Sequence, residues 1–217
     1  MREINFWLKD CLELLDKNFG DRLWFVGLQG SHGRGEAGEN SDIDLVVILD
    51  EISSCDIKTY DGMLDSLPHR ELVCGFISGK SELFGWEPSE LFHLYHDTTP
   101  IRGSLEDIKP LIDDEAVERA IRIGAGSIYH SCSHNMLHEK SNEILKDLYK
   151  AASFVVKAVV YRQTGEYFGR ATDIHCVLSP EERKIFQTYL AIKNGEELDF
   201  NTMSEELFNW SKGLIGE

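Results

Sequence analysis

Hydrophobic and polar residues in the first half of the chain follow two patterns, one with the period of a helix and one of short apolar runs. Apolar residues recur at helical spacing over residues 4–19, which predicts an amphipathic helix that ends before Gly20. Short, mostly apolar runs that are bounded by glycine, proline or charged residues predict strands. These runs cover residues 22–28, 42–49 and 70–78.

Between and after the predicted strands, the first half contains further structured segments. Residues 57–67 predict a helix that Pro68 ends, and residues 88–95 predict a short helix with proline at its first position. Residues 98–103 are interpreted either as a last edge strand or as an extended connector. This order of elements is typical of a mixed β-sheet with flanking helices.

The second half changes to long helical patterns with almost no strand signal. Ser179 and Pro180 mark a helix start, with serine as the N-cap and proline at the first position. Helices are predicted over residues 113–138, 142–161, 180–193 and 204–212. We therefore expect an α+β fold, with an N-terminal domain over residues 1–110 and an all-α helical bundle over residues 111–217.

The candidate chemistry lies in the segment LQGSHGRGEAGENSDIDLVVIL. Side chains alternate along a strand, so Asp42 and Asp44 point to one face, where they repel each other unless a divalent cation lies between them. Gly30 and Ser31 follow the preceding strand. Glycine lets a phosphate approach the backbone, and the first N–H groups of a helix attract anions. Together the two parts predict a site for a metal–triphosphate complex.

This combination of a strand, a Gly-Ser turn, a polar stretch and an Asp-x-Asp that opens an apolar strand resembles the nucleotidyltransferase superfamily of the DNA polymerase β type. Within it, the chain is most similar to small two-domain members with a helical C-terminal domain, such as aminoglycoside and other antibiotic nucleotidyltransferases. The motif covers residues 22–50, and the two-part layout extends the resemblance more loosely over the chain.

The resemblance implies a catalytic site with one or two Mg²⁺ ions and ATP as the co-substrate. Asp42 and Asp44 match the paired metal ligands of the family, and Glu71 is the candidate for its third carboxylate, with Glu82 and Glu87 as alternatives. In such a site an acceptor hydroxyl attacks the α-phosphorus, and pyrophosphate leaves.

Further residues around the Gly-Ser turn are candidates for binding the nucleotide. Gly30 and Ser31 match the family's triphosphate-binding turn, and Ser41 directly precedes the paired aspartates. Arg34 is a candidate for a phosphate contact, although a solvated loop arginine explains this residue equally well.

The resemblance also implies that the first helices of the second half contact the acceptor. Glu115 and Glu118 are candidates for the general base, and His130 and His134 are candidates for the same role or for binding the acceptor. With His138, these histidines form one stripe, which either binds a metal or is simply a polar helix face. The sequence does not choose among them.

Composition narrows the range of partners and surroundings. The 217 residues include 22 Lys and Arg against 38 Asp and Glu, a formal charge of −16. Proteins bind nucleic acid largely by neutralising its phosphates with basic side chains, so this negative charge disfavours nucleic acid as a partner. The charge either attracts cationic small molecules or only keeps the chain soluble. Five widely spaced cysteines without a C-x-x-C pair, and no signal peptide or apolar stretch of membrane length, predict a cytoplasmic protein without membrane contact.

These observations favour an enzyme that transfers a nucleoside monophosphate, with AMP from ATP as the expected donor group, to a hydroxyl of a small-molecule acceptor. An aminoglycoside-like polycation suits the acidic composition. Two alternatives stay open: a nucleotidyltransferase that adenylylates a protein, as antitoxin-like members do, and a catalytically inactive nucleotide-binding protein.

Overall fold

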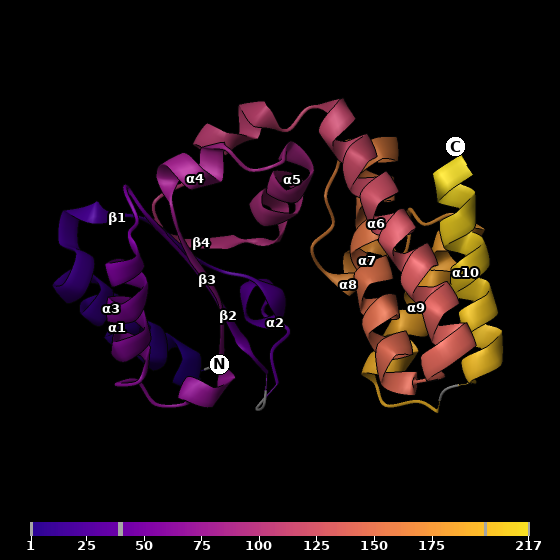
Figure 1. The fold of residues 1–217 in the computed structure, drawn as a ribbon, viewed down its shortest axis with the longest axis horizontal. Coiled ribbons are helices and arrows are strands. Elements are labelled where there is room, and N and C mark those ends of the chain that lie inside the picture. The colour runs from indigo at the N-terminus through magenta and orange to yellow at the C-terminus, as the bar shows by residue number, and fades with distance from the viewer. Residues whose placement is uncertain (1, 39–40, 198, 217) are drawn as a thin grey trace. The chain divides into compact units, whose positions relative to one another are not determined.

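The computed structural model describes residues 2–38, 41–197 and 199–216. The chain divides into two compact units, Met1–Leu111 and Ile112–Glu217 (Figure 1). The first unit is built on a β-sheet and the second from helices. The α+β fold class expected from the sequence is confirmed.

A mixed sheet forms the centre of the first unit (Figure 1). Among the described residues it has four strands in the order β3-β2-β1-β4. β1 (Leu23–Leu28) is antiparallel to β2 (Ile43–Leu49) and to β4 (Thr99–Arg102), whereas β3 (Val73–Gly79) is parallel to β2. Of the two interpretations of residues 98–103, the edge strand is therefore the right one.

The third strand begins later than the sequence predicts. Residues 70–78 were expected to be extended, but Arg70–Leu72 form a 3₁₀ turn, η2, and β3 starts at Val73. The turn follows His69, whose φ of 61° lies in the left-handed region that residues other than glycine rarely adopt. Glu71 consequently lies in a turn and not in the ladder.

Helices cover the sheet and close its hydrophobic core. Side chains from α1 (Arg2–Phe19) and α3 (Ser54–Leu64) form one buried cluster with alternate residues of β2, among them Leu45 and Val47. The other alternate residues of β2, such as Val46 and Ile48, are fully buried as well, so both faces of this strand are covered. The first unit also contains the helices α2 (Gly30–Arg34), α4 (Lys80–Phe84) and α5 (Pro88–Asp97) and the 3₁₀ segments η1 (Gly20–Arg22) and η3 (Glu106–Leu111).

The start of α3 illustrates how local side chains fix an element. Ser53 and Asp56 form a capping box in which each side chain accepts a hydrogen bond from the backbone of the other. Arg22 donates to both oxygens of Asp56, at 2.9 and 3.0 Å, and this contact holds the pKa of the Asp56 carboxyl below its usual range. Helix α3 therefore begins three residues before the predicted start at residue 57.

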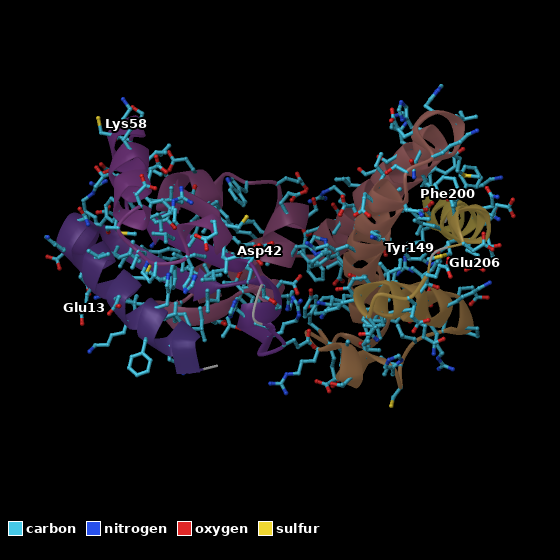
Figure 2. The ribbon with its side chains drawn as sticks, turned by 90° about the horizontal axis from the view of Figure 1, so that it is seen from below. Glu13, Asp42, Lys58, Tyr149, Phe200 and Glu206 are labelled. Carbon is cyan, nitrogen blue, oxygen red and sulfur yellow. The ribbon has the colours of Figure 1, made fainter. Side chains whose placement is uncertain are left out.

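The second unit is a helical bundle, as predicted. Its long helices pack in neighbouring pairs, with α7 in contact with both α6 and α9, and α6 in contact with α10. Tyr149, labelled in Figure 2, joins α7 to α10 by donating a hydrogen bond to the carbonyl of Met203 at 2.9 Å. The helices are α6 (Asp114–His134), α7 (Asn142–Thr164), α8 (Ala171–Ile174), α9 (Pro180–Lys193) and α10 (Phe200–Gly216).

The helix predicted over residues 113–138 changes its winding near its end. After His134 the chain forms a π-helical turn, Asn135–Glu139 (η4). The buried Asn135 side chain donates to the carbonyl of Ser141 and accepts from its N–H, at 3.0 and 2.9 Å, which ties this turn to the start of α7. Within the described ranges, the helices include none with the length and apolar character needed to cross a membrane.

Candidate active site

The turn after β1 lies directly against the carboxylate of Asp44. The N–H of Gln29 donates to the carbonyl of Asp44 at 2.8 Å. Gly30 follows with a φ of 62°, and a Cβ atom at this position would lie 2.0 Å from Oδ2 of Asp44. Only glycine therefore allows this approach. The structure brings together the two parts of the motif, which are separated in the sequence.

The paired aspartates lie at the start of β2. Asp42, labelled in Figure 2, is exposed directly before the strand, and Asp44 is half-buried within it. Ile43 between them is buried in the core of the first unit. This alternation is what the sequence predicted, except that the ladder starts at Ile43 and not at Asp42.

The Gly-Ser turn opens a short helix. Gly30 and Ser31 are its first residues, and the first N–H groups of a helix have no acceptor within it. Two backbone hydrogen bonds stabilise the turn. The N–H of Gly33 donates to the carbonyl of Gln29 at 3.1 Å, and the N–H of Glu36 donates to the carbonyl of Ser31 at 2.8 Å. The arrangement can present backbone donors and a serine hydroxyl to an anion beside the Asp44 carboxylate.

The two other nucleotide candidates, Arg34 and Ser41, contact the loop between α2 and β2. Arg34 forms an ion pair with Glu36, with Nε 3.2 Å from Oε2. Ser41 accepts a hydrogen bond from the N–H of Gly38 at 2.9 Å, and its carbonyl lies 3.4 Å from Nε2 of His32. These contacts give both residues a part in the loop structure, and their roles toward a nucleotide stay predictions.

Glu71 does not share the strand face of Asp44. Its side chain is 72% exposed, and Oε1 lies 3.7 Å from Nδ1 of His69. The register of the parallel pair places Cys74 beside Asp44. The described residues contain no group of three His, Cys, Asp or Glu side chains that could hold a metal ion, so Glu71 is not gathered with the two aspartates into such a set. Its role as third ligand stays a prediction.

The register identifies residues that sequence reasoning missed. Cys74 is exposed and shares a face of the sheet with Asp44, and Phe76 follows two positions along the same strand. The Phe76 ring packs on Trp86 at a centroid distance of 5.3 Å, and both residues are half-buried. The register of β3 against β2, which the sequence does not give, had to be known before these residues could be placed beside Asp44.

The candidates from the second half all lie on α6. Both glutamates form ion pairs with arginines. Oε2 of Glu115 lies 3.7 Å from Nη1 of Arg119, and Oε2 of Glu118 lies 3.4 Å from Nη1 of Arg162. Their roles as a general base stay predictions.

The histidine candidates are exposed on the same helix. His130 and His134 lie in its last two turns, and the ring of His134 is 4.7 Å from that of His138 in η4. Nothing in these contacts assigns the histidines to an acceptor, so this role also stays a prediction.

The two aspartates fit a magnesium ion that is completed by substrate. Mg²⁺ in nucleotide sites is commonly held by one or two carboxylates together with phosphate oxygens and water. Asp42 and Asp44 supply hard oxygen ligands of this kind, and Gly30, which has no Cβ atom where Oδ2 of Asp44 lies, lets the turn approach the Asp44 carboxylate closely.

Two comparisons with known proteins gave a match. Residues 8–121 match the family described as nucleotidyltransferase domain. A similar solved structure is the spectinomycin adenyltransferase AAD(9) from Enterococcus faecialis, crystallised with ATP and spectinomycin. The TM-score is 0.62 at 15% identity, over 96% of this chain and 99% of that one, which shows a shared fold. A search of curated proteins gave no match.

Proposed function

The chain belongs to the nucleotidyltransferase domain family, and on this premise we propose that it transfers AMP from ATP to a hydroxyl of a small molecule. The observation that carries the proposal is the contact between Gly30 and Asp44. The contact sets a turn whose backbone N–H groups can receive a phosphate beside the Asp44 carboxylate, and carboxylates suit a divalent cation.

In the proposed reaction the two aspartates hold the metal end of the site. Asp42 and Asp44 bind Mg²⁺ through their carboxylate oxygens. When bound, Mg²⁺ supplies positive charge that stabilises the triphosphate and its leaving group. Glu71 is the third ligand only if its exposed side chain turns toward the aspartates on binding.

The turn after β1 holds the phosphate chain. The N–H groups of Gly30 and Ser31 and the Ser31 hydroxyl donate to phosphate oxygens and stabilise the charge that develops on pyrophosphate. The acceptor oxygen forms a bond to the α-phosphorus, the bond from that phosphorus to pyrophosphate breaks, and the hydroxyl proton passes to a base. Glu115, Glu118, His130 and His134 remain the candidates for this base.

A cationic acceptor such as an aminoglycoside suits the charge of the chain. The formal charge of −16 raises the local concentration of cations near the protein. The similar structure AAD(9) is an adenyltransferase crystallised with spectinomycin, which supports an antibiotic-like acceptor for this chain.

A reducing compartment suits the cysteines. Five cysteines are free, and three of them, Cys55, Cys74 and Cys176, are exposed. Exposed thiols persist where the surroundings are reducing, which supports a cytoplasmic location.

The proposal is tested by measuring both products of the reaction, the nucleotidylated acceptor and pyrophosphate. The protein is incubated with Mg²⁺ and ATP labelled at the α-phosphate, together with a panel of aminoglycosides and spectinomycin. We expect label in one acceptor and an equal amount of pyrophosphate, and we expect at least a hundredfold loss of both in Asp42→Asn/Asp44→Asn, by the usual size of metal-ligand effects. Label on a protein would instead identify a protein-adenylylating enzyme. ATP binding without transfer to any acceptor would favour an inactive nucleotide-binding protein.

A further inference from the structure

Two consecutive threonines hold the turn that carries Gly30 and Ser31. Thr98 directly follows α5, and its Oγ1 accepts a hydrogen bond from Nε2 of Gln29 at 3.0 Å while donating to the carbonyl of Leu94. Thr99 begins β4, and its Oγ1 donates to the carbonyl of Gly33 at 2.7 Å. Thr98 therefore forms a hydrogen bond with Gln29, the residue before α2, and Thr99 forms one with Gly33 in α2.

Glycines on the other side of these contacts allow the close fit. A Cβ atom at Gly27 would lie 2.5 Å from the Thr98 methyl group. A Cβ atom at Gly33 would lie 2.5 Å from the carbonyl of Leu28 and 3.5 Å from Oγ1 of Thr99. Gly27 in β1 thus leaves room for the Thr98 methyl group, and Gly33 allows α2 to lie close to the Leu28 carbonyl, with Thr99 at ordinary contact distance.

Strand pairing fixes where the two hydroxyls lie. β4 pairs with β1 so that Thr99 is opposite Leu28, the residue before Gln29. Thr98 is only 7% exposed and Gln29 is half-buried, so water competes little for the bond between them. These contacts come from α5 and β4, far in sequence from the turn, and neither threonine belongs to the Gly-Ser and Asp-x-Asp motif.

We propose that Thr98 and Thr99 are positioning residues, which set the Gly30–Ser31 turn at the spacing from Asp44 that a magnesium–triphosphate complex requires. The proposal rests on the proposed function. Neither hydroxyl has to touch the nucleotide, because each acts through a turn residue, Thr98 through Gln29 and Thr99 through Gly33. Removal of both hydroxyls loosens the turn and lowers the affinity for Mg-ATP, while the core of the unit stays packed.

The first part of the test measures the turn without any ligand. Thr98→Val and Thr99→Val keep the side-chain shape and remove only the hydroxyl. Hydrogen exchange at the Gly33, Gly35 and Glu36 amides, which all donate within or around α2, should become about tenfold faster in the double variant. Thr59→Val is the matched control, because Oγ1 of Thr59 also donates to the carbonyl four residues earlier, at 3.0 Å, but on α3.

The second part measures Mg-ATP binding by calorimetry. The double variant should bind Mg-ATP about tenfold more weakly, the size expected for two modest hydrogen bonds. Thr98→Ser restores the hydroxyl and should bind like the wild type, and so should Thr59→Val. A purely structural role would lower the fraction of folded protein and leave the dissociation constant of the folded fraction unchanged. Thr99→Val alone, at an exposed position, provides the measurement if the double variant does not fold.

The two measurements separate this proposal from the proposed function. Unchanged exchange at α2, or an unchanged affinity for Mg-ATP with faster exchange, overturns the positioning role. Wild-type protein that does not bind Mg-ATP overturns the proposed function, and the role in setting a triphosphate site falls with it. Faster exchange would then show only that the threonines hold the turn. Faster exchange together with weaker binding in the double variant, and wild-type affinity in Thr98→Ser, establishes the proposal.

Discussion

At the scale of single residues, the candidate site depends on the close approach of the Gly30 backbone to the Asp44 carboxylate. The glycine has no side chain where Oδ2 of Asp44 lies, and its φ of 62° is one that other residues rarely adopt. The backbone turn and the carboxylate therefore occupy adjoining space, which is the arrangement that a metal-bound triphosphate needs.

A pair of glycine substitutions separates contact from backbone strain. Gly30→Ala puts a methyl group against Asp44, whereas Gly35→Ala has a similar φ of 71° with no heavy atom within 4 Å. Both variants should lose about 1–2 kcal/mol of stability from the strained backbone. Only Gly30→Ala should lose Mg-ATP binding, by about a hundredfold, as measured by calorimetry. Equal losses of binding in the two variants would contradict the proposed contact.

The lowered pKa of His96 should make the stability of the first unit depend on pH. Burial lowers the pKa of this histidine to about 4, and Asp97 partly opposes the effect. Unfolded histidine takes up a proton near pH 6.5, so between pH 6.5 and 4 the unfolded chain binds more protons and stability falls as pH falls. In His96→Gln, the loss of stability between pH 7 and pH 5 should be smaller by about 1 kcal/mol, after allowance for partial exposure. Thermal unfolding at both pH values checks this, with the exposed His130→Gln as control; an unchanged pH dependence in His96→Gln would contradict it.

At the scale of elements, register decides which side chains meet. The sequence predicted the strands β1 and β2 to within one residue, because both are strongly apolar and have polar residues on either side. It placed the start of β3 at residue 70, and the 3₁₀ turn over Arg70–Leu72 shifted that start to Val73. Glu71 thereby fell outside the ladder, and the register of β3 against β2 makes Cys74 the neighbour of Asp44.

Other elements were beyond sequence reasoning for physical reasons. Helices α4 and α8 have five and four residues, too few to show a helical period. The π-helical turn after His134 depends on the buried Asn135 side chain and its bonds to Ser141, which only tertiary packing reveals. The threonine contacts to α2 likewise join residues more than sixty positions apart.

The register predicts that nucleotide protects one cysteine. Cys74 is exposed beside Asp44, whereas the exposed Cys55 and Cys176 lie at the start of α3 and just after α8. Saturating Mg-ATP should slow alkylation of Cys74 by about tenfold or more, because bound phosphate covers its face of the sheet. Mass spectrometry of alkylated peptides measures all three sites at once. Equal protection of Cys55 or Cys176, or none at Cys74, would contradict the placement of the nucleotide.

At the scale of the whole molecule, charge is the property that the fold alone does not explain. An excess of sixteen acidic over basic residues exceeds what the two predicted metal ligands account for. Such a charge repels nucleic acid and draws cations toward the protein over a distance set by the ionic strength.

This charge predicts a salt dependence for acceptor binding. The dissociation constant of a polycationic aminoglycoside should rise about tenfold between 50 and 300 mM salt, because screening weakens the long-range attraction. A neutral sugar of similar size serves as the control and should show no such change. Salt-independent binding of the polycation would mean that the acidic surface contributes only to solubility.

The most direct test of the central claim is calorimetric titration of ATP with and without Mg²⁺, on the wild type and on Asp42→Asn/Asp44→Asn. These substitutions remove the two carboxylates at the start of β2 and keep the side-chain volumes. We predict that the wild type binds ATP only when Mg²⁺ is present and that the variant does not bind it under either condition. Equal binding by both proteins, or no binding by the wild type, would contradict the assignment of these aspartates to a metal–triphosphate site.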